Sequence, residues 1–97
     1  NIVWRNASFR GYADYMETRT YAAAFERLCV QAVAAPTALM CAEAMWWQCH
    51  RALISDDLKA RGVEVLHIMG ERVAEHPYTE PAIVVDGRVQ YAPPSLF

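Results

Sequence analysis

The sequence lacks an excess of basic charge and a long uncharged run, and each absence excludes a class of protein. Nine lysines and arginines face eleven acidic residues, so the net charge is -2. No global positive field attracts nucleic acid or an acidic membrane surface. The longest stretch without a charge covers residues 28–42, whereas a bilayer span needs about 20 apolar residues. We therefore expect neither a membrane protein nor autonomous nucleic-acid binding.

Glycine and cysteine are also scarce. The four glycines form no Gly-rich phosphate loop. Three cysteines cannot all pair with one another, and reduced thiols favour a cytoplasmic location. The length of 97 residues suits one domain, and a hydrophobic content of 55% excludes disorder.

The first half of the chain predicts one long helix. Residues 1–17 have the pattern of an extended lead-in with a short helical turn at 12–16. Thr18 or Thr20 can cap a helix that runs to Pro36. Its apolar face would consist of residues at helical spacing, Tyr21, Phe25, Leu28, Cys29, Ala32 and Val33.

The second half predicts a strand, a helix, a strand and a hairpin. The apolar run at 37–42 is typical of a buried strand. A helix over 49–61 would bury Leu53, Ile54 and Leu58, and a second strand covers 63–68. Residues 83–91 predict a hairpin with its turn at Asp86-Gly87.

Strand, helix and strand in this order predict an α/β fold: a βαβ unit with parallel strands, followed by the hairpin. A parallel sheet buries both faces, and two strands are too few for that. We therefore expect residues 1–97 to form a single, partial α/β domain. A larger three-layer Rossmann-like sheet would be completed by a missing N-terminal half or by a partner chain, including a second copy. A compact two-layer domain is the alternative.

The candidate site lies where the strand at 37–42 ends and the next helix begins. Ligands of open α/β sheets bind beyond the carboxyl ends of the strands, where helix N-termini favour anions. Arg51 could hold a phosphate or carboxylate there. Glu43 and His50 are acid–base candidates, and Cys49 or Cys41 is a candidate nucleophile.

Each of these residues also has a structural interpretation. Cys41 suits a small core position. Glu43 and Arg51 could form an ion pair that fixes the loop. His67 and His76 are more typical of packing or loop positions than of a site. Two further groups favour packing, Cys29 in the core and the pair Trp46-Trp47 in packing or at an interface.

Four blocks of sequence resemble the bacterial and archaeal family called domain of unknown function 488. They are Phe9-Arg10-Gly11-Tyr12-Ala13-Asp14-Tyr15-Met16, Ala38-Leu39-Met40-Cys41-Ala42-Glu43, Cys49-His50-Arg51 with Leu53-Ile54, and Gly62-Val63-Glu64-Val65-Leu66-His67-Ile68. The resemblance covers roughly positions 4–91. It implies a single domain with a mostly parallel sheet, of which this chain would be the C-terminal half. It also places Arg10 and Tyr12 among the characteristic positions, with Cys41, Glu43, Cys49, His50 and Arg51.

Three functions remain open from the sequence. The first is an enzyme, or a degenerate enzyme, that binds a small anionic or nucleotide-like ligand through Arg10, Tyr12 and Arg51. The second is an interaction or assembly subunit that completes a sheet with a partner. The third is a metal or redox module built from Cys41, Cys49, His50 and Glu43, although the spacing matches no paired zinc motif. The residues identify no cofactor.

Overall fold

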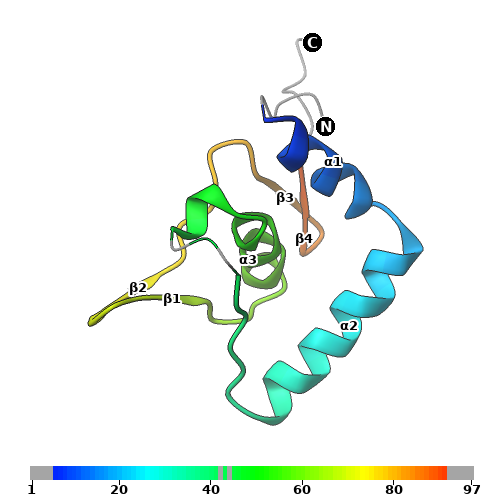
Figure 1. Ribbon diagram of the computed structural model, residues 1–97. Coiled ribbons are helices and arrows are strands. Elements are labelled where there is room, and N and C mark those ends of the chain that lie inside the picture. Colours follow the sequence, from blue (N-terminus) through cyan, green and yellow to red (C-terminus); the bar gives the residue numbers. More distant parts are fainter. Residues whose placement is uncertain (1–5, 42, 44, 92–97) are drawn as a thin grey trace.

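The computed structural model describes residues 6–41, 43 and 45–91 as a small α/β protein. Figure 1 shows α3 at the centre, with the β1–β2 hairpin on one side and α2 on the other. The elements in chain order are α1 (Ala7–Tyr15), α2 (Arg19–Ala34), the 3₁₀ turn η1 (Trp46–Gln48), α3 (Arg51–Ala60), β1 (Leu66–Met69), β2 (Arg72–Glu75), β3 (Ile83–Val85) and β4 (Arg88–Gln90).

The prediction for residues 1–17 is wrong over the described part, because α1 is a full helix rather than a single turn. The Asn6 side chain caps it by accepting hydrogen bonds from the backbone N–H groups of Ser8 and Phe9. Phe9, Ala13 and Met16 recur at helical spacing and are buried. The first half of the protein therefore packs as two helices.

The predicted α2 is confirmed. It begins after Thr18, whose side-chain oxygen accepts a hydrogen bond from the backbone N–H of Tyr21. Tyr21 and Phe25 enter the core, whereas Val33 is 84% exposed. The apolar stripe therefore packs at the start of the helix and faces outward at its end.

The central helix α3 is also confirmed. Leu53 is fully buried and Leu58 nearly so, while Ile54 packs partly against the core. Gly62 follows the helix at φ 87°, a left-handed conformation that glycine adopts without strain. The core around this helix combines residues of both halves of the chain, namely Phe9, Ala13, Met16, Tyr21, Phe25, Ala52, Leu53, Leu58 and Tyr91.

The strands of the described residues form two antiparallel hairpins rather than a parallel sheet. In the first, Leu66 pairs with Glu75 and Met69 with Arg72. The second confirms the predicted hairpin: Ile83 pairs with Gln90, and the turn residues Asp86 and Gly87 have φ of 51° and 73°. Two positive φ values suit the turn that joins twisted strands.

The predicted βαβ unit is not formed. Residues 37–41 make no strand and are all exposed, and residue 42 lies outside the described residues. The predicted strand at 63–68 starts only at Leu66, and it pairs with its neighbour β2 through a local turn. An apolar run becomes a buried strand only when sheet partners cover it, and no described segment pairs with 37–41.

Candidate functional site

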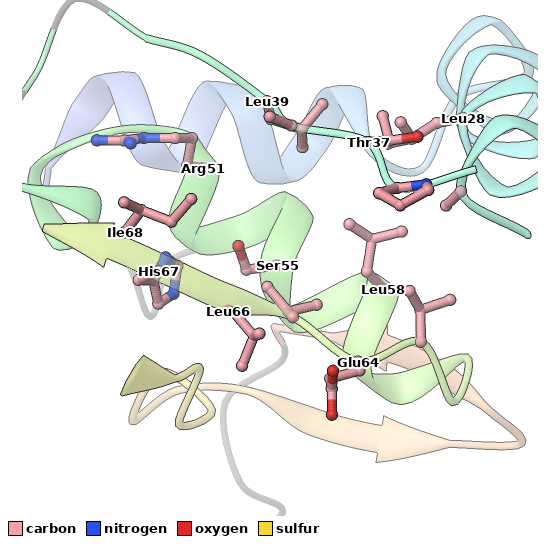
Figure 2. Close-up of a pocket in the computed structure, with 15 residues that line it drawn as sticks. Leu28, Thr37, Leu39, Arg51, Ser55, Leu58, Glu64, Leu66, His67 and Ile68 are labelled. Atoms are coloured by element: carbon pink, nitrogen blue, oxygen red, sulfur yellow. The ribbon is translucent and has the colours of Figure 1, made fainter. Parts of the chain in front are cut away.

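A cavity of about 390 Å³ lies between α3 and two neighbouring segments. One wall is the extended stretch 63–68 that leads into and includes most of β1, and another is the turn at 36–39 after α2 (Figure 2). Arg51, Ser55 and His67 contribute polar groups to a lining that is otherwise mostly apolar. An apolar cavity of this size with a few convergent polar groups is typical of a small-molecule site.

Arg51 is the cationic residue of this lining. Its Nη2 donates to the backbone carbonyl of Glu43 over 2.6 Å, and its Nε donates to the Cys49 sulfur over 3.4 Å. The backbone N–H of Arg51 donates to the same sulfur over 3.2 Å. These contacts fix the Arg51 side chain at the edge of the cavity (Figure 2) and leave further N–H donors of its guanidinium without a partner among them.

The structure brings together only part of the predicted site. Arg51, Cys49 and Glu43 are in contact, but through the sulfur of Cys49 and the main chain of Glu43. The predicted Glu43–Arg51 ion pair is absent from the salt bridges of the described residues. Cys49 is buried at 6% exposure, whereas Cys41 is exposed. The three thiols form no disulfide.

His50 and Tyr12 contact each other away from this cavity. The His50 ring stacks on Tyr12, with ring centroids 4.5 Å apart, and its Nε2 lies 2.9 Å from the Ser8 hydroxyl. Burial, followed by the neighbouring Tyr15, raises the pKa of Tyr12 to about 12. These residues join α1 to the start of α3. Arg10 is half-buried on α1, and neither it nor His50 or Tyr12 lines the cavity.

A buried polar network connects the cavity wall to α3. His67 Nε2 lies 2.7 Å from His76 Nδ1, and His76 Nε2 lies 2.7 Å from Asp56 Oδ1. Asp56 and His76 are fully buried, and His67 is 7% exposed. Trp46 covers the network, stacked parallel to the His67 ring with centroids 4.4 Å apart. The three side chains form a continuous chain that ends at the cavity.

Asp56 is surrounded by hydrogen-bond donors. Besides His76, it accepts the Thr79 backbone N–H over 2.9 Å, the Thr79 hydroxyl and the Tyr91 hydroxyl over 2.8 Å. Burial, and then the Asp56 charge, raises the pKa of Tyr91 well above its usual value. The Tyr91 hydroxyl is therefore a permanent donor to this carboxylate.

The histidine at the cavity wall stays neutral near pH 7. Burial lowers the pKa of His67 to about 4. A positive charge on His76, when that ring is protonated, and the charge of Arg51 act in the same direction. A neutral imidazole has one donor and one acceptor nitrogen, so it can either give or take a proton.

Asp56 and its neighbour Asp57 were not predicted as site residues from the sequence. Asp57 is also fully buried, where it accepts the Tyr21 hydroxyl over 2.8 Å and pairs with Arg88. The signal was available, because both acidic residues fall between Leu53 and Leu58 on the apolar side of the helix. A carboxylate is almost never fully buried unless it is paired.

Two kinds of feature are absent from the described part of the chain. In the ranges 6–41, 43 and 45–91, no group of three or more His, Cys, Asp or Glu side chains is gathered so that it could hold a metal ion. Within the same part of the chain, no helix combines the length and the apolar character that crossing a membrane requires.

Comparison with known proteins identifies a family. The model of a family described as domain of unknown function DUF488 matches residues 1–58, more than half of the 97-residue chain. The matched region includes Arg51 and Asp56 and ends within α3, before β1. No curated protein and no solved structure matches the chain. The match confirms the family over residues 1–58 and does not extend to the block at 62–68. The chain belongs to the DUF488 family.

Proposed function

We propose that this protein binds a small ligand with an anionic group in the cavity beside α3, as an enzyme or a degenerate enzyme. The observation that carries the proposal is that Arg51 is part of the cavity lining, together with His67 and Ser55. Figure 2 places Arg51 at the edge of this lining. A phosphate or carboxylate is the chemical group that a guanidinium recognises best.

The cavity supplies three kinds of contact to such a ligand. Arg51 provides charge, Ser55 provides a hydroxyl, and the apolar walls bury the rest of the molecule. Glu64 also lines the cavity, but it lies away from Arg51 (Figure 2). The anionic group therefore belongs at the Arg51 end, and a volume of about 390 Å³ suits a nucleotide-like molecule.

The roles of the predicted catalytic residues change with this geometry. Cys49 and Glu43 position Arg51, through the sulfur and the carbonyl oxygen that its guanidinium contacts. His50 is paired with Ser8 at a different face, so it is not part of the proposed site. The candidate acid–base group at the cavity is instead His67.

The experiment that tests this proposal is a binding titration with inorganic phosphate and with adenosine monophosphate. Binding would be followed by NMR shifts of the backbone amides of residues 51–55 and 63–68. Arg51→Gln should weaken binding about ten- to one-hundred-fold, because it removes a charge-assisted hydrogen bond. Arg19→Gln, an equal charge change at the exposed start of α2, is the control. Equal affinity of the two variants would refute the proposal.

A second candidate function is assembly, and the exposed apolar side chains favour it. Met40 is 93% exposed and Ile68 is 71% exposed. Leu39 and Leu66 are also among the exposed large hydrophobic residues. These four residues lie on the segments that the sequence predicts to be neighbouring strands. We propose that a strand of a second copy or a partner chain adds here and extends the sheet towards the larger Rossmann-like form.

Native mass spectrometry separates the two functions. A monomer that retains a small anion supports the ligand site, whereas a ligand-free dimer or hetero-complex supports assembly. Met40→Lys and Ile68→Lys place charges on the apolar surface and should dissociate such a complex. A monomer at high concentration would contradict the assembly function.

A further inference from the structure

We infer that His67 is the acid–base group of the cavity and that His76 and Asp56 act with it as a proton relay. This inference rests on the proposed ligand site at Arg51 and narrows its ligand class. The ligand would carry an anionic group for Arg51 and, next to it, an ionisable hydroxyl or thiol for His67. His76 and Asp56 are positioning residues, since neither lines the cavity.

The relay begins at Asp56, which fixes the hydrogen positions. The Thr79 backbone N–H can only donate, and it shares Asp56 Oδ1 with His76 Nε2. This oxygen is thus an acceptor for both, and His76 Nε2 carries a hydrogen. In a neutral imidazole the other nitrogen, His76 Nδ1, is then an acceptor.

The same reasoning sets the tautomer of His67. Its Nε2 lies 2.7 Å from the acceptor His76 Nδ1, so Nε2 carries the hydrogen. The remaining nitrogen, His67 Nδ1, keeps a lone pair. No residue of the described ranges makes a hydrogen bond to His67 Nδ1. Since His67 lines the cavity, this lone pair is the acceptor that the inference assigns to the ligand.

The proton transfer balances without any further reactant. The ligand X–H bond breaks and its proton moves to His67 Nδ1, which leaves X⁻ near Arg51. The hydrogen on His67 Nε2 moves to His76 Nδ1 in the same step. His67 is neutral again in its other tautomer, and the positive charge rests on His76 beside Asp56. The reverse transfer makes His67 a general acid.

The surrounding charges explain why two histidines are needed. Arg51 lies on the His67 side and disfavours a positive charge there. The Asp56 carboxylate contacts His76 and stabilises the cation at that ring. Lys59 donates to the His76 backbone carbonyl over 2.7 Å, and its ammonium pairs with Glu75. The relay therefore moves the charge from the ring beside Arg51 to the ring beside a carboxylate.

The first test is the tautomer of His67 in the ligand-free wild-type protein. Histidine ¹⁵N labelling and long-range ¹H–¹⁵N spectra at neutral pH distinguish the two ring nitrogens. We expect a hydrogen on Nε2 and a lone pair on Nδ1 in both His67 and His76. A hydrogen on His67 Nδ1 would overturn the relay. The chain has three histidines, and His50→Gln assigns the signal that lies outside the cavity.

The second test is the variant Asp56→Asn, followed by the same spectra across pH. Its amide oxygen can keep the contacts to Thr79 and His76, so the tautomers should persist while the charge is lost. Protonation of the histidine pair should then move to lower pH by about one unit or more. Asp57→Asn removes an equally buried charge from the same helix, without a contact to either histidine, and should produce a smaller shift. Equal shifts in the two variants would overturn the relay.

These tests separate the relay from the ligand site. Both use the ligand-free protein, so a failure to bind phosphate or adenosine monophosphate leaves the tautomer result intact. Conversely, the binding titration depends on Arg51 and not on the His67 tautomer. If Asp56→Asn fails to fold, the wild-type spectra still decide the matter.

Discussion

The buried carboxylate of Asp57 joins α2, α3 and β4, and replacing it tests how much these contacts add to the free energy of unfolding. Its oxygens accept the Tyr21 hydroxyl of α2 over 2.8 Å and pair with Arg88 of β4 over 3.2 Å. Asp57→Ala removes both contacts at once. The free energy of unfolding should therefore fall, although the alanine improves the helix propensity of α3.

The magnitude follows from the exposure of each partner. The Tyr21 side chain is 4% exposed, and a buried hydroxyl without a partner costs about 1–3 kcal/mol. Arg88 is 39% exposed, so water solvates most of its charge, and losing the pair costs about 1 kcal/mol or less. The gain in helix propensity offsets roughly 0.5 kcal/mol. We expect a net loss of about 1–3 kcal/mol, a large share of the stability of a small domain.

The assay is urea unfolding followed by tryptophan fluorescence, with Tyr21→Phe and Arg88→Gln as companions. Tyr21→Phe should cost about 1–2 kcal/mol, because it leaves the carboxylate paired with the arginine. Arg88→Gln should cost less, since the arginine is partly solvated. An Asp57→Ala protein whose stability equals that of the wild type would refute the buried network as a source of stability.

Two further predictions concern pH and the hairpin turn. Burial is the main cause that lowers the pKa of His67 from 6.5 to about 4. The unfolded chain therefore binds a proton in this pH range that the folded chain does not. The free energy of unfolding should thus fall as pH drops from 6.5 towards 4, by about 3 kcal/mol at most. Urea titrations should show a smaller decrease for His67→Gln than for the wild type, and the same decrease as the wild type for His50→Gln. Gly87→Ala should destabilise the protein by about 1 kcal/mol, because φ is 73° there. Gly11→Ala within α1, where a Cβ meets open space, should stabilise it by about 0.5–1 kcal/mol in thermal unfolding. Similar changes in stability for the two variants would contradict the turn geometry.

Local signals in the sequence predicted several elements correctly. Thr18 and the apolar spacing after it identify α2, and Gly62 marks the end of α3. Asp86-Gly87 identifies the second hairpin. α1 was predicted only as a short turn, although Phe9, Ala13 and Met16 have helical spacing and Asn6 is a typical cap. Caps and turns depend on a few neighbouring residues, so they can be predicted from the sequence.

The candidate site was predicted only in part from the sequence. Arg51 was identified from its place at a helix N-terminus, and it does line the cavity. His50 is next to it in the chain, but the helix turns its ring towards Tyr12. Neighbours in a helix point in different directions, so adjacency in a motif does not place two side chains in one site.

The sequence by itself determined the family, the two main helices and the hairpin turn, because each depends on local residues in a fixed order. The tertiary structure alone decided that β1 pairs with β2 rather than with residues 37–41. It also decided that Asp56, His76 and His67 meet, although 20 and nine positions separate the successive pairs. The physical reason is that strand pairing and buried polar contacts depend on which surfaces remain available once the helices have packed.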